Sequence, residues 1–146
     1  MLEAFSTPRN RNRTFILFAI CGVLAAAAAT LGSDDNPLGF LLAFVSASAF
    51  VVAFAHPWRT SLQFLRLFGA SFLGFFVFGF LHNVFGAVAS MAGVSGFVHD
   101  LLGGAGVASF YVAVFLCPPG FLVGAVGAVV LSRRERRRKA AESYRW

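Results

Sequence analysis

Two adjacent side chains in the third of four long apolar stretches have the residue types for chemistry inside a membrane. At about 100° per residue, His82 and Asn83 fall within an arc of about 100° that otherwise carries small residues. The members of this polar arc are Gly79, His82, Asn83, Gly86, Ser90 and Gly93. Because hydrocarbon gives a polar group no hydrogen-bond partner, we predict that His82 and Asn83 face other helices.

Two interpretations of the polar arc stay open. In the first, His82 and Asn83 make hydrogen bonds between helices, each worth about 0.6 kcal/mol, and the glycines allow close approach. In the second, the arc is a binding site in the outer half of the membrane, with His82 as ligand or proton acceptor. His99, in the connection that follows, is the candidate second histidine of that site.

The positions of the histidines and cysteines argue against a resident cofactor. A haem held by two histidines needs ligands on facing helices at matched depth. His56 is expected at the membrane surface opposite to His82 and His99, which share one continuous segment. Cys21 and Cys117 lie in the middle of apolar stretches with no metal-binding or redox spacing, which is typical of inert buried thiols. We therefore expect no cofactor, no metal site and no catalytic residue.

The second feature whose residues could take part in chemistry is Cys117-Pro118-Pro119-Gly120, near the centre of the fourth stretch. Each proline removes a backbone donor and clashes with the carbonyl four residues earlier, so we predict a helix kinked or broken at Cys117-Pro118-Pro119. Again two interpretations stay open. The break is either a kink that shapes packing or a pair of half-helix ends that hold an ion or a polar substrate at mid-membrane.

Four membrane-spanning helices must position these residues. We predict spans at about residues 14–31, 38–55, 61–92 and 105–131, long enough for a hydrocarbon core of about 30 Å. Thr60 or Ser61 is the expected N-cap of the third helix. Residues 93–106 are expected to form a glycine-rich connection, within which residues 97–102 can lie on the bilayer surface. The composition agrees, since 58% of residues are hydrophobic and 12% are charged, against about 25% charged in soluble domains.

The basic residues orient these four spans. All twelve Lys and Arg lie in residues 1–13, in residues 132–146, or at Arg59 and Arg66, which precede the apolar body of the third span at Leu67. The other two connections carry Asp34, Asp35 and Asp100 and no Lys or Arg. Basic residues flanking a span are retained in the cytoplasm, so both termini are predicted to be cytoplasmic, with residues 1–13 and 132–146 as basic tails around a 14–131 membrane domain.

Two groups of small residues predict close helix contacts. Gly120, Gly124 and Gly127 share one face of the fourth helix. The corresponding face of the first helix carries Gly22, Ala25, Ala26 and Ala29. Such faces let backbones approach in lipid, either within one chain or between copies.

The fold class predicted from these features is an all-α integral membrane protein. We expect a non-enzymatic subunit, assembly partner or scaffold of a membrane complex that works through helix–helix contacts. An oligomeric channel or transporter, with a path lined by the polar arc and the break in the fourth helix, is the first alternative, and a membrane redox or metal site using His82 and His99 is the second. The expected partners are other membrane subunits or further copies, and no nucleic acid, because no aromatic platform accompanies the basic charges.

The expected location is the cell membrane. Basic side chains near a bilayer surface gain roughly 1 kcal/mol each from anionic lipid, so the arginine-rich C-terminal tail is expected to contact anionic headgroups. Eleven Arg against one Lys is typical of a GC-rich prokaryotic genome, which favours a prokaryotic plasma membrane.

Overall fold

The protein is all-helical throughout the residues that the computed structural model describes, which are 5–32, 36–91 and 96–143. The helices are α1 (Pro8–Leu31), α2 (Pro37–Ala55), α3 (Ser61–Ala89), α4 (Phe97–Tyr111) and α5 (Cys117–Ser143). A five-residue π-helical segment, η2 (Val112–Leu116), joins α4 to α5 without an intervening loop. The predicted all-α class is therefore confirmed for the described chain.

Within those residues, four helical segments are long and apolar enough to cross a membrane. Three are α1, α2 and α3, and the fourth is the continuous stretch Phe97–Ala141 that contains α4, η2 and most of α5. Their most apolar 18-residue windows have mean hydropathies from 1.9 to 2.3. This is the pattern of a multi-pass membrane protein.

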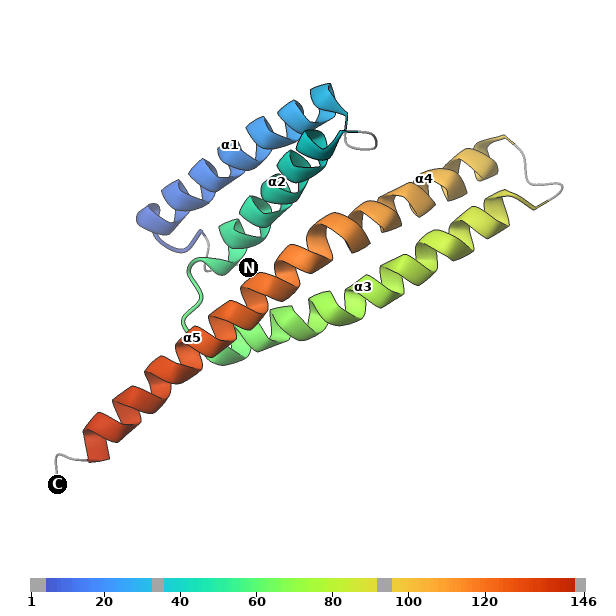
Figure 1. Cartoon of the computed structure of the whole chain (residues 1–146). Helices are drawn as coiled ribbons and strands as arrows, with labels where there is room; N and C mark the ends of the chain where they lie inside the picture. The colour runs from blue at the N-terminus through green and yellow to red at the C-terminus, as the bar shows by residue number, and fades with distance from the viewer. Residues whose placement is uncertain (1–4, 33–35, 92–95, 144–146) are drawn as a thin grey trace.

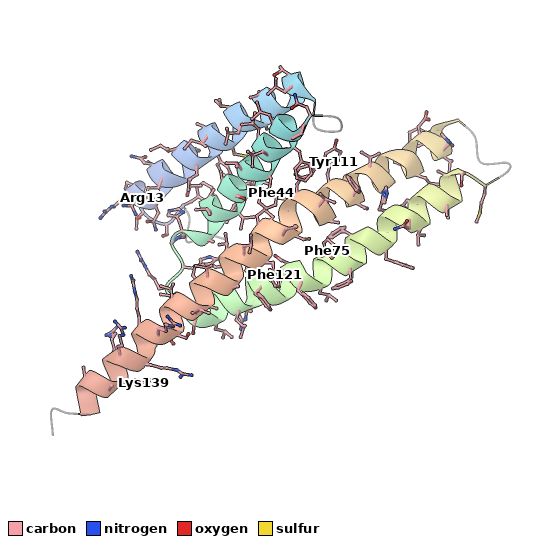
Figure 2. The ribbon with its side chains drawn as sticks, in the orientation of Figure 1. Arg13, Phe44, Phe75, Tyr111, Phe121 and Lys139 are labelled. Carbon is pink, nitrogen blue, oxygen red and sulfur yellow. The ribbon has the colours of Figure 1, made fainter. Side chains whose placement is uncertain are left out.

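The helices form two antiparallel hairpins (Figure 1). One consists of α1 and α2, and the other of α3 and the long α4–η2–α5 helix. The hairpins meet where α2 packs on η2 and α5. The N-terminal end of α1, the α2–α3 connection and the C-terminal end of α5 all lie at one end of the molecule, and Figure 2 shows Arg13 and Lys139 on that side.

Local capping explains where the helices begin. The Thr7 hydroxyl accepts from the Asn10 backbone N–H at 3.2 Å, and the Asn36 side chain accepts from the Leu38 N–H at 3.0 Å. A proline follows each of these caps, at the helix position where its missing N–H costs nothing. The prediction that Thr60 or Ser61 begins the third helix is confirmed, with Thr60 as N-cap.

Two boundaries differ from those expected. Helix α1 begins at Pro8 rather than near residue 14, because its capped first turn continues into the basic segment. The fourth helix begins at Phe97, so residues 97–102 and the expected start at Ala105 lie within a helix rather than in a connection. The cost of helical glycine, about 1 kcal/mol each, is smaller than the cost of leaving backbone groups without partners beside lipid.

The buried core consists mostly of small side chains. Its hydrophobic members are Ala28, Ala47, Ala53, Ala55, Ala89, Ala113, Phe115 and Cys117. Many large apolar residues other than Phe115 point outward instead, and Phe80 is 68% exposed. Only 6% of the most apolar window of α3 and 28% of that of α2 are buried. Lipid or neighbouring helices must therefore cover most of the apolar surface.

Candidate functional site

His82 is the residue that joins α3 to α4 by a side-chain hydrogen bond. Its Nδ1 lies 2.9 Å from the Gly106 carbonyl oxygen, and its ring centroid is 5.2 Å from that of Phe110. A carbonyl oxygen only accepts, so Nδ1 carries the hydrogen and Nε2 of the neutral ring is an acceptor. The structure thus places the half-buried His82 between two helices of the same chain.

Asn83 and Ser90 lie on the exposed side of the polar arc, away from α4. Asn83 is exposed, and its Nδ2 donates to the Gly79 carbonyl of its own helix at 2.8 Å. Ser90 is also exposed, and its hydroxyl donates to the Ala87 carbonyl at 2.9 Å. Asn83 therefore does not face another helix of this chain, because it is turned about 100° from His82, away from α4. Gly93, the last member of the arc, lies outside the described residues.

His99 and His82 make separate contacts at different heights along α4. His99 is exposed in the first turn of α4, where its Nδ1 is 3.4 Å from Asp100 Oδ1. His82 contacts the same helix at Gly106, seven residues or roughly 10 Å further along the axis. Within the described residues, no group of three or more His, Cys, Asp or Glu could hold a metal ion.

Glycines bring the long fourth helix against α3. A Cβ added at Gly106 would lie 3.5 Å from Phe85 Cβ and 3.6 Å from the His82 carbonyl. At Gly124 it would lie 2.6 Å from the Phe68 backbone nitrogen, a distance that real Cβ atoms do not occupy. We call the contact made by Gly106, Gly120, Gly124 and Gly127 with α3 the glycine interface.

The two predicted small-residue faces have different roles. Added Cβ atoms at Gly120 and Gly127 would clash with Ser71 and Phe64 of α3, so the intrachain interpretation of this face is confirmed. On α1, by contrast, Gly22 has open space around it, and Ala25, Ala26 and Ala29 are exposed. Contact with α2 comes instead from the adjoining face of α1, which includes Cys21 and the buried Ala28.

The prolines of the fourth helix follow a change in hydrogen-bond register. In η2 the turn widens, and the Cys117 N–H donates to the Val112 carbonyl five residues earlier. Pro118 and Pro119 then occupy the first turn of α5, where a backbone N–H has no partner within that helix. The chain remains helical through both prolines, and a bend of the axis there stays a prediction. Cys117 is buried, with its Sγ 3.3 Å from a Cβ built on Gly74.

A groove of about 440 Å³ lies between the first hairpin and residues 111–116 of the fourth helix. Cys21, Ser46 and Tyr111 line it together with alanines and phenylalanines. The Ser46 hydroxyl donates to the Cys21 carbonyl at 2.9 Å, which satisfies the hydroxyl hydrogen within the chain. His82, Asn83 and the two prolines are not among the residues that line this groove.

A polar cluster joins the N-terminal part of α1 to the C-terminal end of α2. Thr14 is 0% exposed, and its hydroxyl lies 3.0 Å from the Asn10 carbonyl and 3.4 Å from that of Ala53. His56 Nδ1 lies 3.0 Å from the same Ala53 oxygen, and His56 Nε2 is a buried atom without a hydrogen-bond partner among the described residues. Sequence reasoning missed this cluster, although a threonine at the edge of an apolar span signals such a contact.

Glu135, among the arginines of α5, contacts the first residue of α3. The Ser61 hydroxyl lies 3.2 Å from Glu135 Oε2, and the Ser61 N–H lies 3.4 Å from Oε1. A carboxylate at a helix N-terminus is favoured by the helix dipole. This contact positions the surrounding arginines of α5 beside the α2–α3 connection.

The described side chains thus gather into helix contacts rather than into one cluster of reactive groups. His82 has the geometry of a helix–helix hydrogen bond, and Asn83 offers polar atoms to the surroundings. Comparisons of the chain with protein-family models, with curated proteins and with solved structures found no match.

Proposed function

We propose that this chain is a non-enzymatic polytopic membrane protein that serves as a subunit, assembly partner or scaffold of a membrane complex. The observation that carries the proposal is the two-sided character of α3. One side packs on the fourth helix through His82 and the glycine interface. The other side exposes Asn83, with open space beside Gly79 and Gly86. A polar amide and two uncovered glycines at membrane depth are suited to a further helix.

The proposal includes an orientation with both termini in the cytoplasm of a cell, most consistent with a prokaryotic plasma membrane. Its support is the concentration of Arg and Lys in the segments at one end of the helices. In this orientation the arginines of α5 extend beyond the bilayer core and contact anionic headgroups, which attract each basic side chain by roughly 1 kcal/mol.

Thiol labelling of intact cells tests the orientation. In a background without Cys21 and Cys117, a cysteine at Ser33 or Ser95 is expected to react with an impermeant reagent from outside, and one at Ser143 is not. Reversed labelling would show the opposite orientation. Labelling of both Ser95 and Ser143 would show that the chain crosses an odd number of times.

Purification in mild detergent tests the function. The expected product is a particle heavier than the 15.6 kDa chain, containing at least one other membrane subunit. The same particle should survive exchange into lipid nanodiscs, with its mass and composition measured by native mass spectrometry. A monomer without any other subunit contradicts the proposal, whereas an oligomer of this chain alone favours the channel or transporter alternative.

A further inference from the structure

The side-chain amide of Asn83, on the side of α3 that faces away from α4, keeps hydrogen-bonding groups without a partner among the described residues. One hydrogen of Nδ2 is donated to the Gly79 carbonyl at 2.8 Å. The second hydrogen and the acceptor Oδ1 make no hydrogen bond with the described residues, and the side chain is exposed. Asn83 is seventeen residues beyond Arg66 and six before the end of α3 at Ala89, which places it in the outer part of the apolar span. A partner for this amide is favoured there because hydrocarbon supplies none.

The backbone beside Asn83 is accessible to another helix. Gly79 lies one turn before Asn83 and Gly86 one turn after it, and a Cβ added at either would meet nothing within 4 Å. Ser90 continues the same side and is exposed. Together Gly79, Asn83, Gly86 and Ser90 form what we call the Asn83 flank. Small residues on both sides of a polar one allow two helix axes to come close enough for side-chain amides to meet.

The common orientation of all copies in a membrane favours a second copy of this chain as the partner of the Asn83 flank. All copies of one chain insert with the same orientation, so a two-fold axis along the membrane normal pairs each helix with a parallel copy. Each residue then meets itself at equal depth. The remaining amide groups of Asn83 are one donor and one acceptor, so two copies can exchange two hydrogen bonds and leave neither group unpaired. A buried asparagine also fixes the register of paired helices in coiled coils.

We propose that the Asn83 flank is a homodimer interface, in which Nδ2 of each Asn83 donates to Oδ1 of its copy. This inference rests on the proposed function, because it names a second copy of the chain as one of the helix partners of the assembly. Within the complex, the pair would place two copies of the basic α5 helix on the same side of the membrane.

Cysteine cross-linking in native membranes tests the pairing. In a chain with Cys21→Ala and Cys117→Ala, Asn83→Cys is expected to form a disulfide-linked dimer on mild oxidation. The matched control is Val77→Cys, because Val77 is exposed on the same helix but turned about 120° from Asn83. Equal cross-linking at both positions, or linkage of Asn83→Cys to a different polypeptide, would overturn the homodimer.

Energy transfer between differently labelled copies in lipid vesicles measures the strength of the pair. Asn83→Leu is expected to raise the protein-to-lipid ratio for half-dimerisation about tenfold, and Val77→Leu to leave it unchanged. Asn83→Gln keeps an amide and is expected to restore part of the affinity. An Asn83→Leu protein that dimerises as well as the unmodified chain contradicts the inference. If other subunits still co-purify in that case, the inference fails and the proposed function stands. If the unmodified chain is a monomer and no other subunit co-purifies with it, both the inference and the proposed function fail.

Discussion

The two hairpins hold their helices together by different means. In the α1–α2 hairpin, side-chain hydroxyls of Thr14 and Ser46 bond to carbonyls of the opposite helix, at Ala53 and Cys21. In the α3–α5 hairpin, glycines bring one backbone against the other, and the rings of Phe68 and Phe121 pack with centroids 4.4 Å apart. Lipid removes the hydrophobic force between helices, so hydrogen bonds and close packing are the means available. Hydroxyl-to-carbonyl hydrogen bonds join the helices of the first hairpin, whereas the second relies mainly on close packing at its glycines.

The largest expected effect lies in the glycine interface. Gly124→Ala would place a Cβ 2.6 Å from Phe68 N and 2.8 Å from Phe68 Cα, and backbone atoms cannot rotate away. Overpacking of this kind costs about 2–3 kcal/mol. We expect a clear fall in the thermal unfolding temperature in detergent. Gly22→Ala is the control, since the added Cβ meets open space, and equal losses for the two variants would contradict the packing described for the second hairpin.

A smaller effect is expected from the hydrogen bond between the His82 side chain and the Gly106 carbonyl, which joins two helices of the second hairpin. His82→Leu removes the bond to the Gly106 carbonyl and should lower the free energy of unfolding by about 0.5–2 kcal/mol. Leu81→Ala, on a different side of α3, should cost less. Steric trapping in bicelles measures both, and similar losses would mean that His82 does not contribute through α4.

The smallest effect is expected in the first hairpin. Thr14→Val keeps the shape of the buried side chain but removes its hydroxyl, while His56 still donates to the Ala53 oxygen. We expect a loss of about 0.5–1 kcal/mol, in the range of single interhelical hydrogen bonds. Thr30→Val is the matched control, because Thr30 is exposed and its hydroxyl donates, among the described residues, to the Ala27 carbonyl of its own helix. Thermal unfolding of the two variants measures this difference. A larger loss of stability for Thr30→Val than for Thr14→Val would contradict the role of the Thr14 hydroxyl in joining α1 to α2.

Composition and caps were enough to predict the number and approximate position of the helices. Apolar length predicted four spans, and the threonine before Ser61 predicted the start of α3. Periodicity could not predict which part of the polar arc is covered. The arc is about 100° wide, and a modest rotation of α3 decides whether Asn83 or His82 meets the next helix. That rotation depends on contacts such as Phe64 with Gly127, whose partners are far apart in sequence.

The prolines and glycines of the fourth helix show a second limit. Local rules predicted a connection through residues 93–106 and a kink or break at Cys117-Pro118-Pro119, since both residue types disfavour a helix interior. The described backbone is helical from Phe97 to Ser143, and a kink of the axis at the prolines stays a prediction. A widened turn before the prolines and close packing at Gly106 accommodate them. Neither adjustment is visible in the residue order alone, because each depends on the neighbouring turn or helix.

The glycine interface also determines how much freedom the chain loses when the second hairpin closes. Glycine has no side-chain rotamers, so docking Gly120, Gly124 and Gly127 against α3 immobilises no side-chain torsion angles on the α5 side. The loss of side-chain entropy at these positions is therefore confined to their α3 neighbours, such as Phe64 and Ser71. The same property removes any means of adaptation, because a side chain without rotamers cannot rearrange to fit a shifted partner. The second hairpin is consequently expected to have a single register, while the apolar surfaces around it remain free to adapt to lipid.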